Sequence, residues 1–457
     1  MAVAALEQTQ ELTYGDVDRE VRRLMEPAGL GYWAWVSFCL FVVVMGATVW
    51  ANQIYNGLGV TGLTQPTMWA VYITDFVFWV GIAHSGTLIS AILFLFRTRW
   101  RTAVYRLAET MTIFAVMTAG LFPLIHLGRV WFFYWLLPYP NERYLQPDFR
   151  SPLVWDTFAV STYFTISSVF WIVGLIPDVA NAREWAQQWD SGWRKYLYSA
   201  LAFGWRGTER QWRHFAMAYL LLAGFATPLV LSVHSVVSWD FAMAQLPGWH
   251  STIFAPYFVA GAIFSGVAMV LTLLIPLRRI MGLEDLVTTW HLDNLAKVIL
   301  LTSLIVSYSY ICESFVVWYA GDPIEMATFH MRYFGPQGWL FWVMVACNCV
   351  IPLLLFSPRV RTSAAALFVI SLFVNVGMWT ERFVIIAGSL ATNFEPSQWR
   401  FYLPSFTEIT ITAASFAWFL LWFSLFSRFM PIISMTELKE GIGWLREALR
   451  NDYSRAA

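Results

Sequence analysis

The stretch from residue 261 to residue 279, GAIFSGVAMVLTLLIPLRR, decides the class of fold. It carries no charged side chain before its final two arginines, and the apolar run begins several residues earlier. A helix of about 20 apolar residues is long enough to cross the hydrocarbon core of a bilayer, which is about 30 Å thick. We therefore interpret residues 252–277 as a membrane-spanning helix.

Nine other stretches have the same character, so the sequence predicts an all-α integral membrane protein. The apolar runs are long and continuous, which excludes a membrane β-barrel with its alternating segments of about ten residues. We predict ten transmembrane helices, at residues 31–51, 68–96, 107–137, 154–177, 213–236, 252–277, 296–319, 338–356, 363–389 and 405–427.

The composition of the 457 residues agrees with this interpretation. Hydrophobic residues make up 58% and charged residues 13% of the chain, about half the charged share of a soluble domain. The net charge is zero, so there is no overall attraction to nucleic acid. All four cysteines lie in apolar runs, and no CxxC or CxxCH motif occurs. A disulfide scaffold and a covalently attached c-type haem are therefore excluded.

Lysine and arginine are distributed unequally between the two sets of loops. The N-terminal arm, the even-to-odd loops and the C-terminal tail hold 23 of the 29 basic residues, and the opposite loops hold four. The positive-inside rule therefore predicts that both termini are cytoplasmic. The predicted divisions are a cytoplasmic N-terminal arm over 1–30, a membrane domain over 31–429 and a cytoplasmic amphipathic tail over 430–457.

A weak internal repeat relates the second and sixth spans. Ser85-Gly86 aligns with Ser265-Gly266, and both spans end in basic residues. The repeat predicts two four-helix bundles with the same orientation. They would be formed by spans 2–5, over about 68–236, and by spans 6–9, over about 252–389, while spans 1 and 10 are peripheral.

Almost every titratable group within the predicted spans is expected in the outer half of the membrane. His126 lies about 28 Å along the third span, and Arg129 follows at i+3 on the same helical face. Asp156 is in the first turn of the fourth span, His234 is near the end of the fifth, and Asp240 follows in the outer connection. Intramembrane ionisable groups are costly to bury, so this clustering indicates a functional site.

An apolar pocket near one face, with a histidine and a carboxylate at its end, suits the oxidation of a quinol. The reaction removes two electrons and two protons, and we assign His126 and Asp156 as the catalytic acceptors of the protons. Pro123 removes a backbone hydrogen bond and bends the third span, which makes room for a ring.

Other interpretations stay open at this stage. A b-type haem needs two histidines at matching depth, and His126 and His234 are the one pair that meets this condition. Two bundles with internal carboxylates also suit a secondary transporter, and a purely structural membrane anchor is a third possibility. For Glu313, Glu381 and Arg382 the alternative role is ion pairing that locks helices together.

Several motifs resemble the NrfD/polysulfide-reductase family of membrane subunits. They are HSGTLISAILFLFRTRWR (84–101), FPLIHLGRVWFFYWLLPYPN (122–141), SPLVWDTFAVSTY (151–163) and SVHSVVSWD (232–240). Within this family the likeness is greatest to the quinol-oxidising C subunits of bacterial alternative complex III, and the F subunits are near relatives.

The resemblance implies a respiratory or photosynthetic complex in the bacterial inner membrane. It implies quinol as substrate near the periplasmic face, with menaquinol preferred to ubiquinol, and no haem, iron–sulfur cluster or metal bound by this chain. The implied partners are a periplasmic iron–sulfur subunit, a homologous NrfD-like membrane subunit, cytochrome c subunits and lipids. The implied quinol-binding residues are His126, Arg129, Asp156, His234 and Asp240, and candidates for a proton path are Asp75, His84, Glu313, Glu381 and Arg382.

Overall fold

The computed structural model describes residues 13–138, 151–189 and 192–443. Ten helical segments among them are long and apolar enough to span a membrane, which confirms the predicted number of spans. No strand occurs in the described residues. The predicted arm and tail are described only in part, because residues 1–12 and 444–457 lie outside the described ranges.

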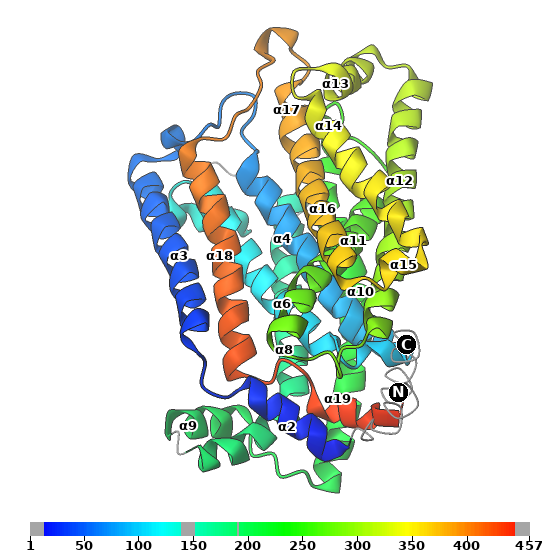
Figure 1. The fold of residues 1–457 in the computed structure, drawn as a ribbon. Coiled ribbons are helices and arrows are strands. Elements are labelled where there is room, and N and C mark those ends of the chain that lie inside the picture. Colours follow the sequence, from blue (N-terminus) through cyan, green and yellow to red (C-terminus); the bar gives the residue numbers. More distant parts are fainter. Residues whose placement is uncertain (1–12, 139–150, 190–191, 444–457) are drawn as a thin grey trace.

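The ten spans run roughly parallel to one another (Figure 1). In chain order they are α3 (Leu30–Asn56), α4–η2–α5 (Val71–Thr87, Leu88–Ile92, Leu93–Leu95), α6–α7 (Tyr105–Ala119, Leu121–His126), α8 (Pro152–Gln188), α10 (Glu209–Ala242), α11 (Phe254–Ile280), α12 (Thr289–Ala320), α14–η5–η6 (Gly338–Val345, Ala346–Val350, Ile351–Phe356), α16–η7–α17 (Ala364–Phe383, Val384–Gly388, Ser389–Ala391) and α18 (Phe406–Phe429).

Shorter elements lie at the two ends of the spans. They are α2 (Tyr14–Leu24), η1 (Leu58–Val60), η3 (Arg99–Arg101), η4 (Val130–Leu136), α9 (Gly192–Leu201), α13 (Pro323–Phe334), α15 (Pro358–Arg361), η8 (Pro396–Gln398) and α19 (Met435–Glu440). Helices α2 and α19 lie side by side at one end of the molecule (Figure 1). We call this end the terminal face and the opposite end the distal face.

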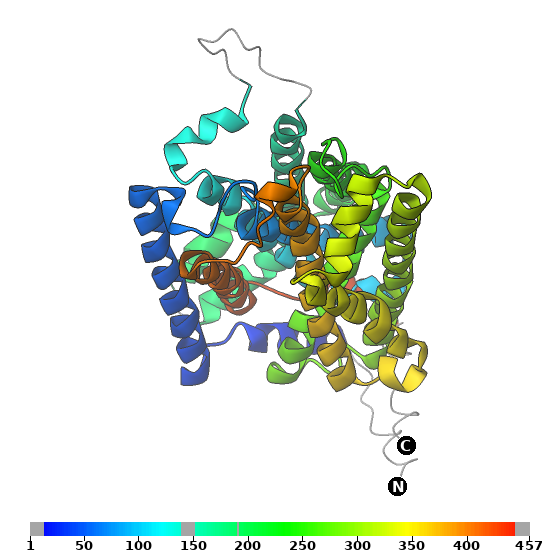
Figure 2. The ribbon, with the colours of Figure 1, turned by 90° about the horizontal axis from the view of Figure 1, so that it is seen from above.

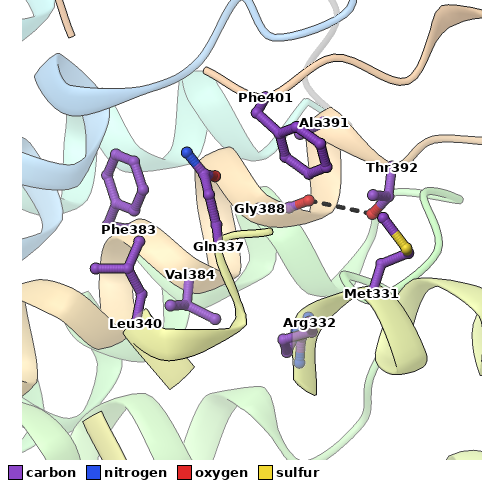
Figure 3. A pocket seen from close by; sticks show the side chains of 10 residues that line it. All are labelled: Met331, Arg332, Gln337, Leu340, Phe383, Val384, Gly388, Ala391, Thr392 and Phe401. Atoms are coloured by element: carbon purple, nitrogen blue, oxygen red, sulfur yellow. Dashed lines mark hydrogen bonds between the residues drawn. The ribbon is translucent and has the colours of Figure 1, made fainter. Parts of the chain in front are cut away.

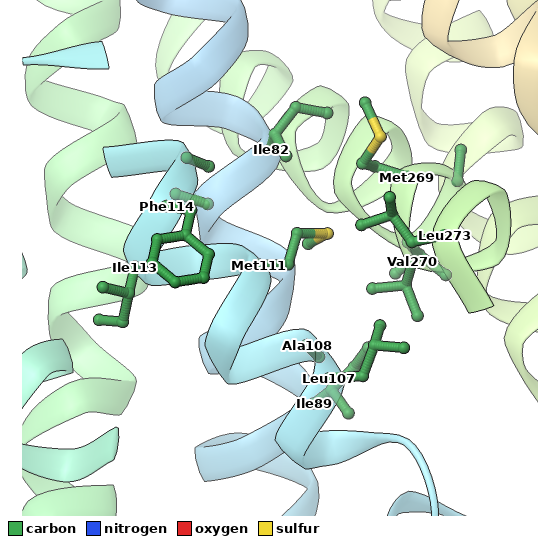
Figure 4. Close-up of a cluster of buried hydrophobic side chains, with 14 of the residues drawn as sticks. Ile82, Ile89, Leu107, Ala108, Met111, Ile113, Phe114, Met269, Val270 and Leu273 are labelled. Carbon is green, nitrogen blue, oxygen red and sulfur yellow. The ribbon is translucent and has the colours of Figure 1, made fainter. Parts of the chain in front are cut away.

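The core lies where α4, α6 and α11 meet. Most residues of the apolar stretches of these three helices are buried, against 17% in α3. Figure 4 shows apolar side chains of α4, α6 and α11 converging there, among them Ile82, Met111 and Val270. Viewed from above, α3 stands at the edge of the molecule (Figure 2), as predicted for the first span.

The predicted grouping into two bundles stays a prediction. Helices α4, α6, α8 and α10 contact one another, and so do α11, α12, α14–η5–η6 and α16. However, α4 packs against α11 about as extensively as α8 packs against α10. The contact pattern therefore does not separate the two sets cleanly.

Glycines of the two repeated Ser-Gly pairs allow the central helices to approach closely. A Cβ atom on Gly86 would lie 2.0 Å from the Thr112 Oγ1 of α6, and one on Gly266 would lie 2.3 Å from the Ser85 Oγ of α4. Small residues at such crossings let the helix backbones pack together in a membrane.

Gly86→Ala is expected to lower the stability of the folded chain by about 1–3 kcal/mol, because the new methyl group overpacks the helix crossing. The new methyl carbon would lie 2.1 Å from the backbone oxygen of Ala108, which is held in a helix and cannot change rotamer as a side chain does. Thermal unfolding in detergent measures the loss. Gly224→Ala is the matched control, since nothing lies within 4 Å of a Cβ there. An equal loss in both variants would contradict the close packing.

Two arginines bind the C-terminal end of α2 at the terminal face. Arg194 donates to the carbonyl of Met25 at 2.7 Å, and Arg428 donates to the carbonyl of Leu24 at 2.8 Å. These carbonyls have no partner within the helix, and a cation there also suits the helix dipole. The segment before the first span is thereby fixed against α9 and α18.

Candidate functional site

The distal ends of α8 and α10 each carry a Trp-Asp pair. Asp156 lies one turn after Pro152, which begins α8, and Asp240 lies in the last turn of α10. The expectation that Asp240 falls in the connection is wrong, because α10 continues to Ala242. The indoles of Trp155 and Trp239 pack edge to face at 5.9 Å, which holds the two helix ends together.

The carboxyl groups of Asp156 and Asp240 are neighbours that interact with each other. Asp156 is buried, and the Oδ1 atom of each residue is buried without a hydrogen-bond partner. Two adjacent carboxyl groups in a low dielectric resist ionising together, so such a pair is able to share a proton. The arrangement places two buried carboxyl groups, each with an unpartnered oxygen, at one end of the spans.

His126 ends helix α7 at the same face. Its Nδ1 is buried and has no hydrogen-bond partner. Gln53 of α3 donates to the carbonyl of Ile125 at 2.8 Å, which fixes the backbone beside the histidine. Within the described part of the chain, no direct hydrogen bond joins His126 to Asp156 or Asp240. The three side chains thus lie at the distal ends of three spans.

Arg129 does not share a helical face with His126, so that expectation is wrong. The helix ends at His126, and Gly128 adopts a positive φ of 71°. Arg129 then has an extended backbone and immediately precedes η4, with its side chain exposed. No described carboxylate forms an ion pair with it.

His84 and His234 meet in the interior, below the carboxyl pair. Their ring centroids are 4.8 Å apart, and Tyr163 of α8 stacks on His84 at 5.0 Å. The Nδ1 of His84 lies 2.5 Å from the carbonyl of Val80, so this nitrogen carries the proton and Nε2 is unpartnered. Neither nitrogen of His234 has a partner among the described residues. Both rings are fully enclosed by the spans.

Direct contact between these two imidazoles leaves no space for a porphyrin between them. They are therefore not the pair of facing ligands that a b-type haem requires. In the described ranges, no group of three or more His, Cys, Asp or Glu side chains is placed to hold a metal ion.

Glu313, Glu381 and Arg382 belong to a separate cluster in the second half of the chain. Glu381 and Arg382 are buried and form an ion pair at 2.9 Å. The hydroxyl of Tyr310 donates to Glu381, and Asn348 donates to that hydroxyl at 2.9 Å. Nearer the distal face, Glu313 pairs with Arg332 of α13 at 2.9 Å.

Asp75 stands apart from both groups. Its two oxygens accept hydrogen bonds from Trp379 at 2.7 Å and Thr412 at 2.6 Å. These bonds join α4 to α16 and α18. Both oxygens have a neutral donor, which suits a structural link between spans as well as a site of proton transfer.

A buried polar cluster near the terminal face was not predicted from the sequence. Arg106 pairs with Asp178 at 3.1 Å, and Tyr219 donates to Glu109 at 3.3 Å. The predicted spans begin at 107 and end at 177, so Arg106 and Asp178 fall just outside them. The i, i+3 spacing of Arg106 and Glu109 is the signal that identifies one buried face. The expectation that nearly all intramembrane charge lies in the outer half is wrong on this account.

Cavities lie toward the distal face of the second half. One of about 30 Å³ lies between α13, α14 and the end of α16, with Arg332, Gln337 and Phe401 among its lining residues (Figure 3). A small one of about 10 Å³ adjoins Tyr310 and Glu313. An open one of about 500 Å³ includes His250 and Glu325.

Ten spans around buried histidines and carboxyl groups define an integral membrane protein with protonatable groups in its interior. The family model for polysulphide reductase NrfD matches residues 59–394, so the chain belongs to the NrfD family.

Three relatives have names that refer to oxidoreductase complexes. A protein of Halobacterium salinarum, assigned provisionally as the C membrane subunit of a dimethyl sulfoxide reductase, is 28% identical over 76% of this chain and 75% of its own. The C subunit of the selenate reductase of Mesobacillus selenatarsenatis is 23% identical over 69% and 73%. The integral membrane subunit of an Hdr-like menaquinol oxidoreductase of Archaeoglobus fulgidus is 20% identical over 79% and 80%. The chain is thus similar to membrane subunits of oxidoreductases.

Proposed function

We propose that this chain oxidises quinol at its distal face, as the membrane subunit of an electron-transfer complex. The observation that carries the proposal is the buried Asp156–Asp240 pair at the same end of the spans as His126. Asp156 Oδ1, Asp240 Oδ1 and His126 Nδ1 have no hydrogen-bond partner among the described residues, and we propose that they bond the hydroxyl groups of a quinol head. The family and the name of the Archaeoglobus relative support quinol, and menaquinol in particular, as the substrate.

The geometry suits a division of the two protons between the histidine and the carboxyl pair. Quinol loses two protons and two electrons as it becomes quinone. His126 accepts one proton through its free Nδ1, and the carboxyl pair accepts the other. The electrons leave to an acceptor outside this chain, for which we propose an iron–sulfur subunit at the distal face. Arg129, exposed beside the site, is proposed to contact the quinol head from its open side.

The distal face is proposed to be the periplasmic one, in a bacterial inner membrane. The support is the excess of lysine and arginine at the other end, with 23 of 29 in the arm, tail and loops of the terminal side. Oxidation at this face releases the protons of quinol outside. The proposed complex also contains cytochrome c subunits and a second NrfD-like subunit, as in alternative complex III, with this chain in the role of its C subunit.

We further propose that polar groups in the first half form a proton path toward the carboxyl pair. It begins at Glu109 near the terminal face and continues through Tyr163 and the His84–His234 contact. The unpartnered nitrogens of the histidines are free to accept and pass on protons. Asp75, with both oxygens bonded, is a branch from this path toward α16 and α18.

Purification of a tagged chain from native membranes tests the function. We expect it to co-isolate with an iron–sulfur subunit and to show quinol-dependent reduction of an electron acceptor. We expect quinol-dependent turnover to be lost when the partner subunits are removed. The reason is that this chain supplies the protonatable site and not the electron acceptor. A chain that isolates alone, with no quinol-dependent electron transfer, would contradict the proposal and would favour a transporter.

A further inference from the structure

The first span contributes one buried polar side chain near its distal end. Four residues of α3 are buried, and three of them, Val36, Cys39 and Gly46, pack against α18. The fourth is Gln53, whose exposed fraction is 0% although α3 stands at the edge of the molecule (Figure 2). Burying an amide is costly unless it is hydrogen bonded, so the partners of Gln53 show what this burial achieves.

The two partners of Gln53 belong to two other spans. Its Nε2 donates to the carbonyl of Ile125 in α7 at 2.8 Å, and the hydroxyl of Tyr72 in α4 donates to its Oε1 at 2.6 Å. A backbone carbonyl only accepts hydrogen bonds, so the amide nitrogen must face Ile125 and the amide oxygen is left for Tyr72. Tyr72 is itself 1% exposed. The orientation of the Gln53 amide is therefore fixed at both ends.

The carbonyl that Gln53 binds belongs to the turn that ends α7 and carries His126. The N–H of Gly128 donates to the same Ile125 carbonyl at 3.1 Å, and the positive φ of Gly128 directs the chain out of the helix. Leu58, which begins η1 directly after α3, packs on this turn, since a Cβ on Gly128 would lie 2.8 Å from the Leu58 Cγ. The distal end of the first span thus contacts the turn at two points.

The position of the His126 ring depends on this turn. Its Nδ1 has no hydrogen-bond partner among the described residues, so the protein does not fix the imidazole through that atom. A proton acceptor must lie within hydrogen-bonding distance of the group that it deprotonates. A displacement of about 1 Å is enough to lower the rate of such a step by about 10²-fold. The backbone beside His126 must therefore be held accurately for the ring to act.

We propose that Gln53, oriented by Tyr72, is a positioning residue for His126. It holds the turn at the end of α7 and thereby sets the direction of the imidazole toward the quinol head. The proposal rests on the proposed function, in which His126 accepts a proton from quinol. Gln53 and Tyr72 exchange no proton in this role. The first span, which elsewhere packs on α18, thus completes the quinol site through one buried amide.

Gln53→Met tests the role in the assembled complex, because methionine has a similar size and forms neither hydrogen bond. We expect kcat for quinol oxidation to fall by about 10²-fold, the scale of a displacement of about 1 Å. KM should stay near the wild-type value, since the lost contact affects the reacting geometry and not the binding of quinol. Tyr72→Phe should lower kcat by a smaller factor, because the Gln53 amide keeps its bond to Ile125 but loses the partner that orients it.

Hydrogen–deuterium exchange at the C2 atoms of the histidines, followed by mass spectrometry, is a second readout that needs no quinol. In Gln53→Met we expect exchange at His126 to become about fivefold faster, the shift in a local opening equilibrium when one hydrogen bond is lost. Exchange at His84 and His234 should not change. Gln337→Met is the matched control, because Gln337 also donates through Nε2 to a backbone carbonyl, that of Tyr402 at 2.9 Å, in the second half of the chain. It should leave kcat and the exchange at His126 unchanged.

Unchanged exchange at His126 in both Gln53→Met and Tyr72→Phe would overturn the proposal, and so would faster exchange at all the histidines. Wild-type kcat in Gln53→Met, where His126→Ala is inactive, would overturn it as well. If Gln53→Met does not assemble, Tyr72→Phe decides, since it keeps the aromatic ring in the core. Wild-type turnover in His126→Ala, with faster exchange at His126 alone in Gln53→Met, would count against the quinol site and not against the positioning of His126. The two proposals therefore fail separately.

Discussion

Asp156→Asn is expected to lower quinol:acceptor turnover of the assembled complex by about 10²–10⁴-fold, the usual scale for a positioned acid–base group. An amide still forms a hydrogen bond with Asp240 but does not accept a proton. His126→Ala removes the other acceptor and should have an effect of the same order. Asp156→Glu should be intermediate, because it keeps a carboxyl group but displaces it by one methylene. Steady-state turnover with a soluble quinol measures all three.

The control for these variants must separate lost chemistry from lost assembly. The relative amounts of all subunits are compared in each preparation. Asp322→Asn is the matched substitution, since Asp322 is an exposed aspartate of the distal face that caps α13, and asparagine caps a helix equally well. It should leave turnover unchanged. Wild-type turnover in an assembled double variant, His126→Ala with Asp156→Asn, would refute the assignment of the site.

Asp178→Ala is expected to destabilise the chain by about 3–5 kcal/mol, because it leaves a buried arginine without its counter-charge. The side chain of Arg106 is 1% exposed, and its Nη2 is shared between Asp178 and the carbonyl of Gly174. Asp178 also accepts two hydrogen bonds from Thr436, at 3.2 Å and 2.9 Å. Unfolding in detergent, followed by tryptophan fluorescence, measures the change.

Two further variants show whether the loss comes from the unpaired charge. Replacing both partners, Arg106→Met with Asp178→Leu, should cost less than Asp178→Ala alone, because no uncompensated charge is left behind. Glu209→Ala breaks an exposed ion pair with Arg213, 3.8 Å long, and should cost about 0–1 kcal/mol. If Asp178→Ala is as mild as Glu209→Ala, the pair does not stabilise the terminal face.

The number and type of spans could be predicted because the length of an apolar run is set by the bilayer. The positions of helix ends could not. Hydropathy falls at Ser238 and Asp240, yet α10 continues through both residues to Ala242, and Trp239 between them packs against Trp155 of α8. At Gly128 the opposite occurs, and the positive φ of one residue ends the third span well before its apolar residues end.

These shifts in helix ends account for most of what the sequence did not reveal about the site. With the fifth span ending six residues later than predicted, His234 lies about 9 Å deeper, at the level of His84. The contact between His84 and His234 depends on which helices are neighbours, and a pattern within one stretch of sequence does not predict that. The cluster at Arg106 was missed because charged residues mark the limits of the predicted spans, although mutual pairing lets them lie inside.

The contacts of α19 determine when, during synthesis of the chain, the terminal face is completed. Arg101 forms an ion pair with Glu437 at 2.7 Å, and Asp178 accepts a hydrogen bond from the Thr436 hydroxyl. Lys439 pairs with Asp18 near the beginning of the chain. During translation the first four spans therefore enter the membrane with charges whose partners have not yet been synthesised. Closure of the terminal face must follow the synthesis of α19.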